Sequence, residues 1–594
     1  MKILISKRFI VKLSQWRSKI FPDRVFIFVL SILIGVLAGL IAVLLKSSVH
    51  TFQEFLISFF SANYNLDLYI LFPIIGLTLS QIFVQVVMKG NLSRGIANVI
   101  LEISKKKGII ASHKMYSQLV SSFFTLGFGG SAGLEAPISV TGAAVGSNIS
   151  SFLRVDERER KLLLGCGAAG GIAAIFNSPI AGVLFAVEII LSDLVISNFV
   201  LLLVSSASAT VISKILYSGQ PFKLITETWE INSLPYYIIL GLICSGISVY
   251  VIRVYYYFSK LYSGWNKPYL KSITGGLALG ILLFIFPALF GEGYNIVEFL
   301  LDGDFLQITN NSLFWQYQNN IWFVLVYCFL IMMIKIIATS ITVNSGGNGG
   351  VFGTSLFTGA MLGFIYARLI NLSGIHSVTE VNYIVVAMAG ILAGVIHSPL
   401  TAIFLIAEIT GGYALFIPLM VVVSLSYFIS IYFEPYSAYT KGIAERGEFI
   451  LYNRDRLILE NIALRKLIET DFIPLKTTDP LGKFIEVIEQ STRNIFPVLD
   501  NKKNLAGIIT LDDVREIIFE RHLYNLLLMQ DIMKKPPAIV DVKESTYNIV
   551  KKIDDLNVWN LPVVKDGKYI GFISKSNILS HYRNLLIKQT ERRM

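Results

Sequence analysis

Two glycine-rich segments hold the residue types that could do chemistry in this chain. GGSAGLEAP begins at Gly129 and includes Glu135 and Pro137, and GGNGGVFGTS begins at Gly346. Proline suits the first turn of a helix, and the free amides and positive dipole end of a helix start can bind an anion. If both segments start helices that face each other, they could hold an anion without lysine or arginine, weakly enough for it to leave.

The two segments belong to a larger internal repeat. AAGGIAAIFNSPIAGVLFAVEI surrounds Ser178, and MAGILAGVIHSPLTAIFLIAEI surrounds Ser398. The Ser-Pro pairs and the later Glu188 and Glu408 align at one constant offset, and the glycine-rich segments align at nearly the same offset. Segments interrupted by Gly and Pro at corresponding positions of two halves indicate a transport site between the halves.

The composition places most of the chain in a bilayer. The 594 residues are 54% hydrophobic and 15% charged, with a mean hydropathy of +0.64, whereas soluble domains average roughly 25% charged residues. This excludes a disordered, collagen-like or fully soluble protein. Charged residues are concentrated after Glu445, which predicts a membrane domain followed by a water-soluble one.

The charge distribution also predicts topology. The net charge of +11 is dispersed, with no basic helix interleaved with aromatics, so we expect no nucleic-acid partner. Residues 1–24 are rich in Lys and Arg, which predicts a cytoplasmic N-terminal segment. The apolar run that follows is too long for a cleavable signal peptide. We expect the inner membrane of a prokaryotic cell, with both termini in the cytoplasm.

Long apolar runs alternate with interrupted ones. We expect membrane spans at 25–45 and near 67–88, 195–217, 234–256, 270–290, 320–339 and 414–433, each long enough for about 30 Å of hydrocarbon. The stretches 122–150, 163–192, 346–370 and 384–411 are too short or too Gly-rich to span simply. Broken helices of this kind occur where the backbone lines a cavity or an ion site. The alternative is close helix packing through small residues.

Glu135 is the strongest single candidate for a functional residue. A carboxylate at membrane depth is costly and marks function by default. When charged, Glu135 would compete with an anion at the first glycine-rich segment, and when protonated it would swing away or carry a proton. The alternative is a structural carboxyl that caps its own helix.

Together these motifs resemble the CLC family of chloride channels and proton/chloride antiporters. The resemblance implies an all-α polytopic membrane fold with an inverted repeat, and a homodimer with one path per subunit for chloride and similar anions. It makes Glu135 the gate, as the glutamate of the family's G-[KR]-E-G-P motif. It also assigns the chloride-binding role to Ala136, Val351, Phe352, Gly353, Tyr439 and Ser93.

Several positions depart from the family pattern. Leu134 replaces the basic residue before the gate, Ala136 replaces the glycine after it, and Thr354 replaces the proline of G-x-F-x-P. In SRGIA, direct alignment puts Arg94 where the family has its anion-binding serine, and a one-residue slip puts Ser93 there.

The anion-facing tyrosine and the inner proton site each leave two interpretations open. PYSAYTKGIAERG offers Tyr439 and Tyr436 for the anion-facing tyrosine, and the context favours Tyr439 over an interfacial aromatic. Antiporters of the family carry an inner glutamate directly after the residue matching Glu188, whereas this chain has Ile189. An aliphatic side chain cannot relay a proton. This favours a passive or uncoupled anion path, with an antiporter that uses another inner proton route as the alternative.

The C-terminal part contains a second repeat. IFPVLDNKKNLAGIITLDDVREI and NLPVVKDGKYIGFISKSNILSHY each predict a strand, a charged turn, a strand and a helix. The pair resembles an α/β tandem CBS module, which implies either an adenine nucleotide site for ATP, ADP or AMP or a structural and dimerisation role. The candidate nucleotide residues are Thr510, Asp513, Ser574 and Asn577, with Asn577 in place of the usual aspartate.

These assignments divide the chain into residues 1–24, the membrane domain 25–445, a linker 446–463, and CBS domains 464–524 and 525–594. We expect no required cofactor, no metal and no enzymatic activity, because the chain has neither HExxH nor a P-loop. A CBS-regulated cation channel or carrier is a weaker alternative. It should carry rings of acidic residues in the pore, but apart from Glu135, Glu188 and Glu408 the interrupted stretches contain few acids.

Overall fold

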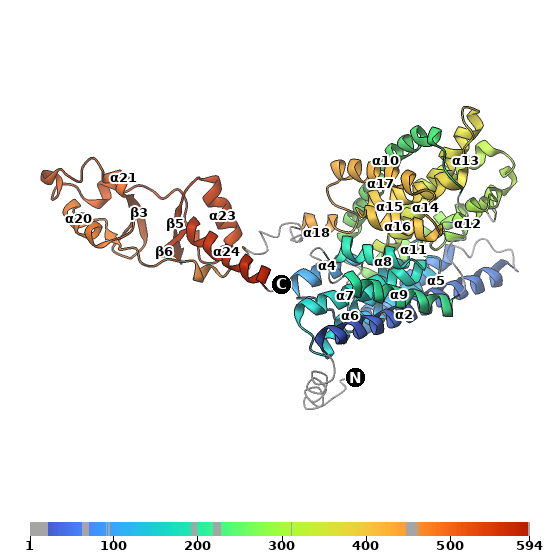
Figure 1. Ribbon diagram of the computed structural model, residues 1–594, viewed down its shortest axis with the longest axis horizontal. Helices are drawn as coiled ribbons and strands as arrows, with labels where there is room; N and C mark the ends of the chain where they lie inside the picture. Colours follow the sequence, from blue (N-terminus) through green and yellow to red (C-terminus); the bar gives the residue numbers. More distant parts are fainter. Residues whose placement is uncertain are drawn as a thin grey trace. The chain divides into compact units, whose positions relative to one another are not determined.

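The chain forms two compact units, Met1–Phe449 and Ile450–Met594 (Figure 1). The computed structural model describes residues 22–61, 70–90, 92, 95–191, 199–217, 227–310, 312–446, 459 and 462–591. The N-terminal segment and the linker predicted from the sequence therefore lie largely outside the described residues.

The first unit is built from helices throughout its described residues. Its α-helices are α2 (Asp23–Ser61), α3 (Leu71–Ile82), α4 (Ile96–Lys105), α5 (Lys114–Gly127), α6 (Glu135–Phe152), α7 (Glu157–Phe176), α8 (Pro179–Phe185), α9 (Phe199–Leu216), α10 (Leu234–Ser263), α11 (Pro268–Ile285), α12 (Tyr294–Leu301), α13 (Ile321–Asn344), α14 (Phe352–Ser373), α15 (Glu380–Ile396), α16 (Pro399–Ile409), α17 (Phe416–Phe433) and α18 (Lys441–Glu445). Short π-helices, Phe83–Val87 and Ala186–Ile190, extend α3 and α8.

Seven helices in the described residues are long and apolar enough to cross a membrane, by length and composition: α2, α9, α10 with its preceding turn, α11, α13, α14 and α17. Six correspond to predicted spans. The predicted span near 67–88 is instead the shorter α3 with its π-turn, and α14 is continuous although 346–370 was expected to be interrupted. The interruption lies before α14, where Gly346, Gly347, Gly349 and Gly350 precede the helix, whereas the later glycines of this stretch lie inside a continuous helix.

The first predicted span ended at residue 45, but α2 continues to Ser61. A helix can continue past the end of a hydrophobic run until glycine, proline or a capping residue ends it. Neither glycine nor proline occurs in the extension. The extension brings Lys46 and His50 into the membrane unit.

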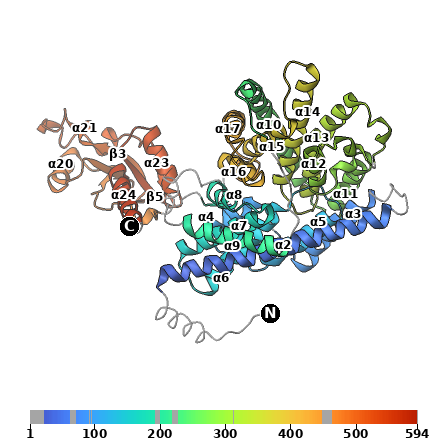
Figure 2. The same cartoon turned by 45° about the vertical axis from the view of Figure 1, so that its right-hand side comes forward.

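The sequence repeat is a repeat of helix packing (Figure 2). In the first half α7 packs against α2, α6 and α9, and α2 packs against α9. In the second half α15 packs against α10, α14 and α17, and α10 packs against α17. Helix α3 also packs against α5 as α11 packs against α13. The duplication therefore includes the helices that pack at the centre of each half.

Matching glycines allow the central helices of each half to touch. A Cβ at Gly142 of α6 would lie 2.1 Å from the carbonyl oxygen of Gly167 in α7. A Cβ at Gly359 of α14 would lie 2.5 Å from the Cα of Met388 in α15. Close packing through small residues is thus present in addition to the broken helices.

The two halves cap each other's interrupted helices. The carboxylate of Glu188 accepts hydrogen bonds from the amides of Leu400 and Thr401 at the start of α16, at 3.0 and 2.8 Å. The carboxylate of Glu408 accepts them from Ile180 and Ala181 at the start of α8, at 3.0 and 2.9 Å. A carboxylate suits the positive end of a helix. Glu188 and Glu408 therefore have the same capping role, and it operates between the halves.

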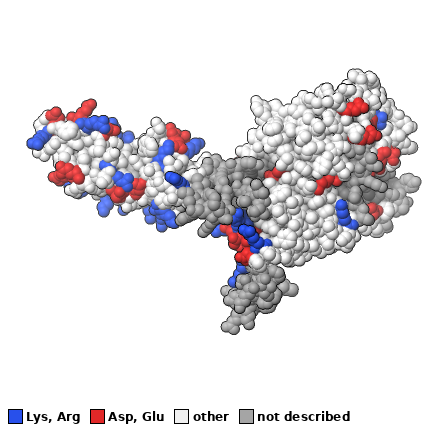
Figure 3. Space-filling view, in the orientation of Figure 1, with Lys and Arg blue, Asp and Glu red and all other residues white. Residues whose placement is uncertain are grey.

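Charge separates the two units as the sequence predicts. Figure 3 shows Lys, Arg, Asp and Glu scattered over the C-terminal unit, whereas the visible face of the membrane unit carries few of them. Many large apolar side chains of the membrane helices are exposed, among them Leu44, Ile215 and Phe428. An apolar exposed surface of this kind fits lipid.

The second unit contains two copies of one α/β motif. Its sheets have the orders β1-β2-β3 and β4-β5-β6, each with one parallel and one antiparallel pairing. The elements are β1 (Leu475–Lys476), α20 (Leu481–Gln490), β2 (Ile495–Leu499), β3 (Leu505–Thr510), α21 (Leu511–Val514), α22 (Met529–Ile532), β4 (Val540–Asp541), α23 (Thr546–Asp555), β5 (Asn560–Lys565), β6 (Lys568–Ser574) and α24 (Lys575–Glu591). The strand–turn–strand–helix order predicted for each copy is confirmed.

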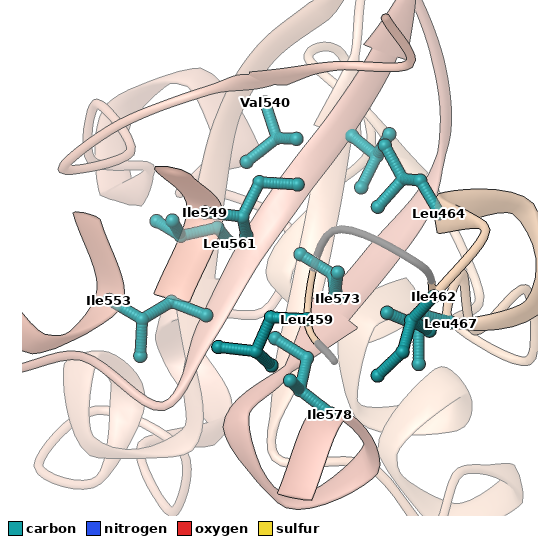
Figure 4. Packing of buried hydrophobic residues seen from close by; sticks show 11 residues of the cluster. Leu459, Ile462, Leu464, Leu467, Val540, Ile549, Ile553, Leu561, Ile573 and Ile578 are labelled. Atoms are coloured by element: carbon teal, nitrogen blue, oxygen red, sulfur yellow. The ribbon is translucent and has the colours of Figure 1, made fainter. Parts of the chain in front are cut away.

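The segment before the first copy belongs to the core of the second. Leu459, Ile462, Leu464 and Leu467 pack with buried residues of β4, α23, β5, β6 and α24 (Figure 4). The Thr546 hydroxyl donates to the carbonyl of Ile462 at 2.9 Å. The start of CBS domain 1, placed at residue 464 from the sequence, thus contributes its side chains to the other copy.

The reciprocal caps generate a prediction about stability. Glu408→Gln leaves one carbonyl acceptor for two helix-start amides and removes the charge. Hydrogen bonds to charged groups contribute about 1.5–3 kcal/mol each, so we expect a lower unfolding midpoint for the purified protein in detergent, measured by circular dichroism. Glu230→Gln alters an exposed carboxyl and serves as the control. Equal midpoints for Glu408→Gln and the wild type would contradict the capping role.

Candidate functional site

The two glycine-rich segments meet through a pair of backbone hydrogen bonds. The amide of Gly133 donates to the carbonyl of Gly350 at 3.0 Å, and the amide of Gly350 donates to Gly133 at 2.9 Å. The pairing is antiparallel. It brings the N-terminus of α6, which begins at Glu135, next to that of α14, which begins at Phe352. The face-to-face helix starts expected from the repeat are present.

Side chains behind this bridge hold the second glycine-rich segment in place. The Asn348 side-chain amide donates to the Gln118 side chain at 2.8 Å and to the Ser122 hydroxyl at 2.9 Å. The Asn348 backbone amide donates to the Thr125 hydroxyl at 3.0 Å. All four side chains are buried. The loop before α14 is therefore fixed to α5 of the other half.

The carboxylate of Glu135 lies between the two helix starts. Its side chain is fully buried, and Oε1 is 3.0 Å from the position that a Cβ would take at Gly353. Oε2 is 2.0 Å from the corresponding position at Gly133 and accepts no hydrogen bond from the described residues. Glycine is required at Gly133 for the carboxylate to lie there. A negative group beside the start of α14 suits the helix dipole.

The structure brings most of the predicted anion-binding positions together. Ala136 follows Glu135 in the first turn of α6, and Val351, Phe352 and Gly353 form the start of α14. All are buried. The Phe352 ring lies 5.3 Å from that of Phe176, centroid to centroid. Ser93 and Arg94 lie outside the described residues.

Tyr439 and Tyr436 lie in different environments. Tyr439 is buried and its hydroxyl has no hydrogen-bond partner among the described residues, whereas Tyr436 is 40% exposed. Glu434 holds this segment through Arg253 at 2.6 Å and Lys441 at 2.5 Å. A buried hydroxyl without a protein partner is compatible with a bound anion.

Sequence reasoning missed two residues that contact the start of α6. The Glu292 carboxylate accepts a hydrogen bond from the amide of Leu134 at 2.9 Å. The Tyr294 hydroxyl donates to Glu135 Oε1. Both residues also line a cavity of about 390 Å³, with His50, Glu54, Asn295 and Gln307 among its other lining residues.

These residues belong to GEGYN, which lies between the predicted spans 270–290 and 320–339. Proximity to Glu135 could not be read from the sequence. One signal was available: Lys335 is an ionisable residue inside an apolar run, which marks function by default. It is fully buried, and its ammonium donates to the carbonyls of Leu289 and Gly291.

Ile189 lies in the π-turn Ala186–Ile190, beside the capping Glu188. Glu188 is engaged by two amides and by the Thr401 hydroxyl at 2.6 Å. The aliphatic Ile189 side chain offers no group that can accept a proton. The carboxylate nearest to Ile189 in sequence is thus committed to a helix cap.

In the first copy of the C-terminal unit, the candidate nucleotide residues bind each other. Asp513 Oδ2 accepts from the Thr510 amide at 2.8 Å and hydroxyl at 2.7 Å, which caps α21. Asp513 Oδ1 pairs with Lys534 at 2.6 Å. Burial opposes ionisation of Asp513, but the Lys534 ammonium and the Thr510 donors outweigh it and hold its pKa below its ordinary value.

In the second copy, the Ser574 hydroxyl donates to Glu469, and the Asn577 side chain donates to the carbonyl of Leu467 at 3.0 Å. Both candidates line a cavity of about 560 Å³ together with Glu469, Arg493 and Trp559. A phosphate near Ser574 would have to displace the Glu469 carboxylate. Nucleotide binding at either copy stays a prediction.

Comparison with known proteins identifies the family. Residues 76–431 match the family model described as voltage gated chloride channel. The chain belongs to this family. Residues 464–520 and 529–584 match the CBS domain model, so this CLC protein carries two CBS domains. It is a multi-pass membrane protein.

The relatives of this CLC chain include both channels and exchangers by name. It is 27% identical over 411 residues to the H(+)/Cl(-) exchange transporter ClcA of Vibrio cholerae, covering 66% of this chain and 83% of the relative. It is 25% identical over 541 residues to chloride channel protein CLC-f of Arabidopsis thaliana, covering 78% of this chain and 67% of the relative.

Solved structures share the CLC fold. A slow cyanobacterial Cl-/H+ antiporter superposes with a TM-score of 0.62 at 21% identity, covering 72% of this chain and 99% of the other. A eukaryotic CLC transporter superposes with a TM-score of 0.60 at 18% identity, covering 93% of this chain and 97% of the other. At these identities the comparison establishes the fold.

The Thr510–Asp513 cap generates a prediction about local stability. We expect Asp513→Ala to raise hydrogen exchange at the Thr510 amide by about fivefold at pH 7, because a helix cap contributes ~1 kcal/mol. Because the pKa of Asp513 is lowered, the wild-type protection should be complete above the ordinary carboxylate range and lost as pH falls below it.

The exchange is measured on the full-length protein by mass spectrometry, with Asp512→Ala as the control because its side chain is exposed. Unchanged exchange at Thr510 in Asp513→Ala would show that the cap contributes nothing.

Proposed function

We propose that this protein conducts chloride and similar anions across a bilayer, along a path that passes between the starts of α6 and α14 and is gated by Glu135. The observation that carries the proposal is the buried Glu135 carboxylate between two helix starts joined at Gly133 and Gly350. Membership of the voltage gated chloride channel family supports it.

The chemistry of this gate follows from charge. Backbone amides and the dipoles of α6 and α14 attract a negative group to the space between the helices. Ionised Glu135 fills that space itself, so it competes with the anion. Protonation removes its charge and its hold on the site, and an anion can then take its place. Ala136, Val351, Phe352 and Gly353 provide the backbone there, and Tyr439 provides a hydroxyl.

The path is passive or uncoupled. Exchange of protons for chloride needs a proton-accepting group on the inner side, and Ile189 has none at the position where the family's antiporters have glutamate. The exchanger named among the relatives makes coupled transport the competing function, through an inner proton route that does not use position 189.

The proposed cellular setting rests on membership of the CLC family. The chain acts as a homodimer in the cell membrane, with both termini in the cytoplasm and one path in each subunit. The paired CBS domains bias the gate from the cytoplasmic side, as a regulatory module with or without adenine nucleotide.

The gate assignment predicts the behaviour of Glu135→Gln. Because glutamine cannot ionise, we expect chloride efflux from liposomes at pH 7.5 to rise several-fold and to change little between pH 4.5 and 7.5. The wild type should be faster at the acidic end. Efflux is followed with a chloride electrode in the presence of valinomycin.

Glu298→Gln is the matched control, since it neutralises an exposed carboxyl on α12 and should keep the wild-type pH profile. If Glu135→Gln retains the full wild-type pH dependence, Glu135 is not the gate.

A further inference from the structure

The turn before α12 is built to present two side chains to the start of α6. Gly291 and Gly293 have φ values of +61° and +88°, in the left-handed region that favours glycine. The Lys335 ammonium donates to the carbonyls of Leu289 at 3.2 Å and Gly291 at 2.9 Å. It also lies 4.9 Å from the centre of the Phe357 ring. The turn is thereby anchored to α13 and α14.

The first side chain is Glu292, which is buried. Its Oε1 accepts the amide hydrogen of Leu134, the residue before Glu135, at 2.9 Å. Its Oε2 lies 3.4 Å from Nε2 of His50. A second carboxylate is therefore fixed next to the gate. Like charges at short range in a buried site oppose joint ionisation.

The second side chain is Tyr294, the first residue of α12. Its hydroxyl donates to Oε1 of Glu135. Among the described side chains, this is the hydrogen-bond donor that the structure gives to the gate carboxylate. A hydrogen bond from a neutral hydroxyl to a carboxylate favours the charged form of the carboxylate. Tyr294 and Glu292 therefore act on Glu135 in opposite directions.

Both side chains line the same cavity of about 390 Å³. The other titratable groups around the two carboxylates come from separate elements. They are Lys46 and His50 of α2, Lys335 of α13 and Tyr439 after α17, with Glu54 on the cavity wall. The Lys46 ammonium donates to the carbonyl of Ile175 at 3.3 Å, and the Lys335 ammonium donates to the carbonyl of Gly291 in the turn.

We propose that Tyr294 and Glu292 are positioning residues that set the proton concentration at which Glu135 leaves the anion path. Tyr294 holds the ionised Glu135 carboxylate in its closed position, and Glu292 destabilises that ionised state by repulsion. This role rests on the proposed gate function of Glu135. It assigns to the turn 289–294 a part in gating that is separate from the anion-binding backbone.

The first test is Tyr294→Phe, which removes one hydroxyl and keeps the ring. Loss of a hydrogen bond to a charged group should free the gate, so chloride efflux at neutral pH should rise. The pH of half-maximal efflux should move upward by about one unit. Tyr250→Phe is the control, because it removes a hydroxyl that donates to the Met333 carbonyl at 3.0 Å, away from the gate.

The second test is Glu292→Gln, which keeps an acceptor for the Leu134 amide and removes the charge. Relief of the repulsion should let Glu135 stay ionised at lower pH. The pH of half-maximal efflux should then move downward by about one unit. Glu54→Gln neutralises an exposed carboxyl on the wall of the same cavity and should leave the profile in place.

Opposite shifts in the two variants support the proposal, whereas a purely structural role would lower efflux at every pH without moving the profile. If Tyr294→Phe does not fold, the shift in the pH of half-maximal efflux in Glu292→Gln alone tests the proposal. Unchanged profiles, or shifts in the reverse directions, overturn the proposal.

Both substitutions are repeated with Glu135→Gln, where they should have no effect on pH dependence. If Glu135→Gln itself keeps the wild-type pH dependence, the gate function fails. If Glu135→Gln is insensitive to pH while Tyr294→Phe and Glu292→Gln match the wild type, only the role of the turn fails.

Discussion

The antiparallel pair of hydrogen bonds between Gly133 and Gly350 is the constraint on which the rest of the membrane unit depends. Each bond satisfies a backbone group that would otherwise be buried without a partner, at a cost of several kcal/mol in a bilayer. It also fixes the distance between the starts of α6 and α14. The Asn348 backbone amide, which donates to the Thr125 hydroxyl, holds the segment before α14 against α5.

This constraint explains why the site needs few charges. Two helix starts supply donors and dipoles without an ammonium or guanidinium group, so an anion is held weakly. Several ionisable side chains within the membrane unit act instead on the gate or on the backbone. Lys335 and Lys46 bind carbonyl oxygens, Glu188 and Glu408 bind amides, and Glu292 and Tyr294 contact the residues at the start of α6.

Local and repeated features of this structure could be predicted from the sequence, whereas contacts between distant segments could not. Glycine, proline and the offset between Ser178 and Ser398 were sufficient to predict the breaks between α7 and α8 and between α15 and α16. The correspondence of Glu188 and Glu408 also followed from the repeat. Tyr294 was missed because its contact with Glu135 joins positions far apart in the chain. The length of α2 was missed because polarity alone does not end a helix.

The C-terminal unit shows the same limit. Each copy repeats a local strand–turn–strand–helix pattern, which the sequence displays directly. The packing of Leu464 and Leu467 into the second copy requires the chain to cross between copies, and no local pattern encodes that crossing. The partners of Ser574 and Asn577 depend on this crossing segment.

A measurement of chloride and proton movement in the same vesicles tests the passive, Glu135-gated path most directly. Purified protein in chloride-loaded liposomes is given valinomycin and no protonophore, and chloride efflux and external pH are recorded together. Chloride efflux without proton uptake is the predicted result, since Ile189 cannot pass a proton. Proton uptake in fixed proportion to chloride, which can be driven uphill by a chloride gradient, would contradict a passive path.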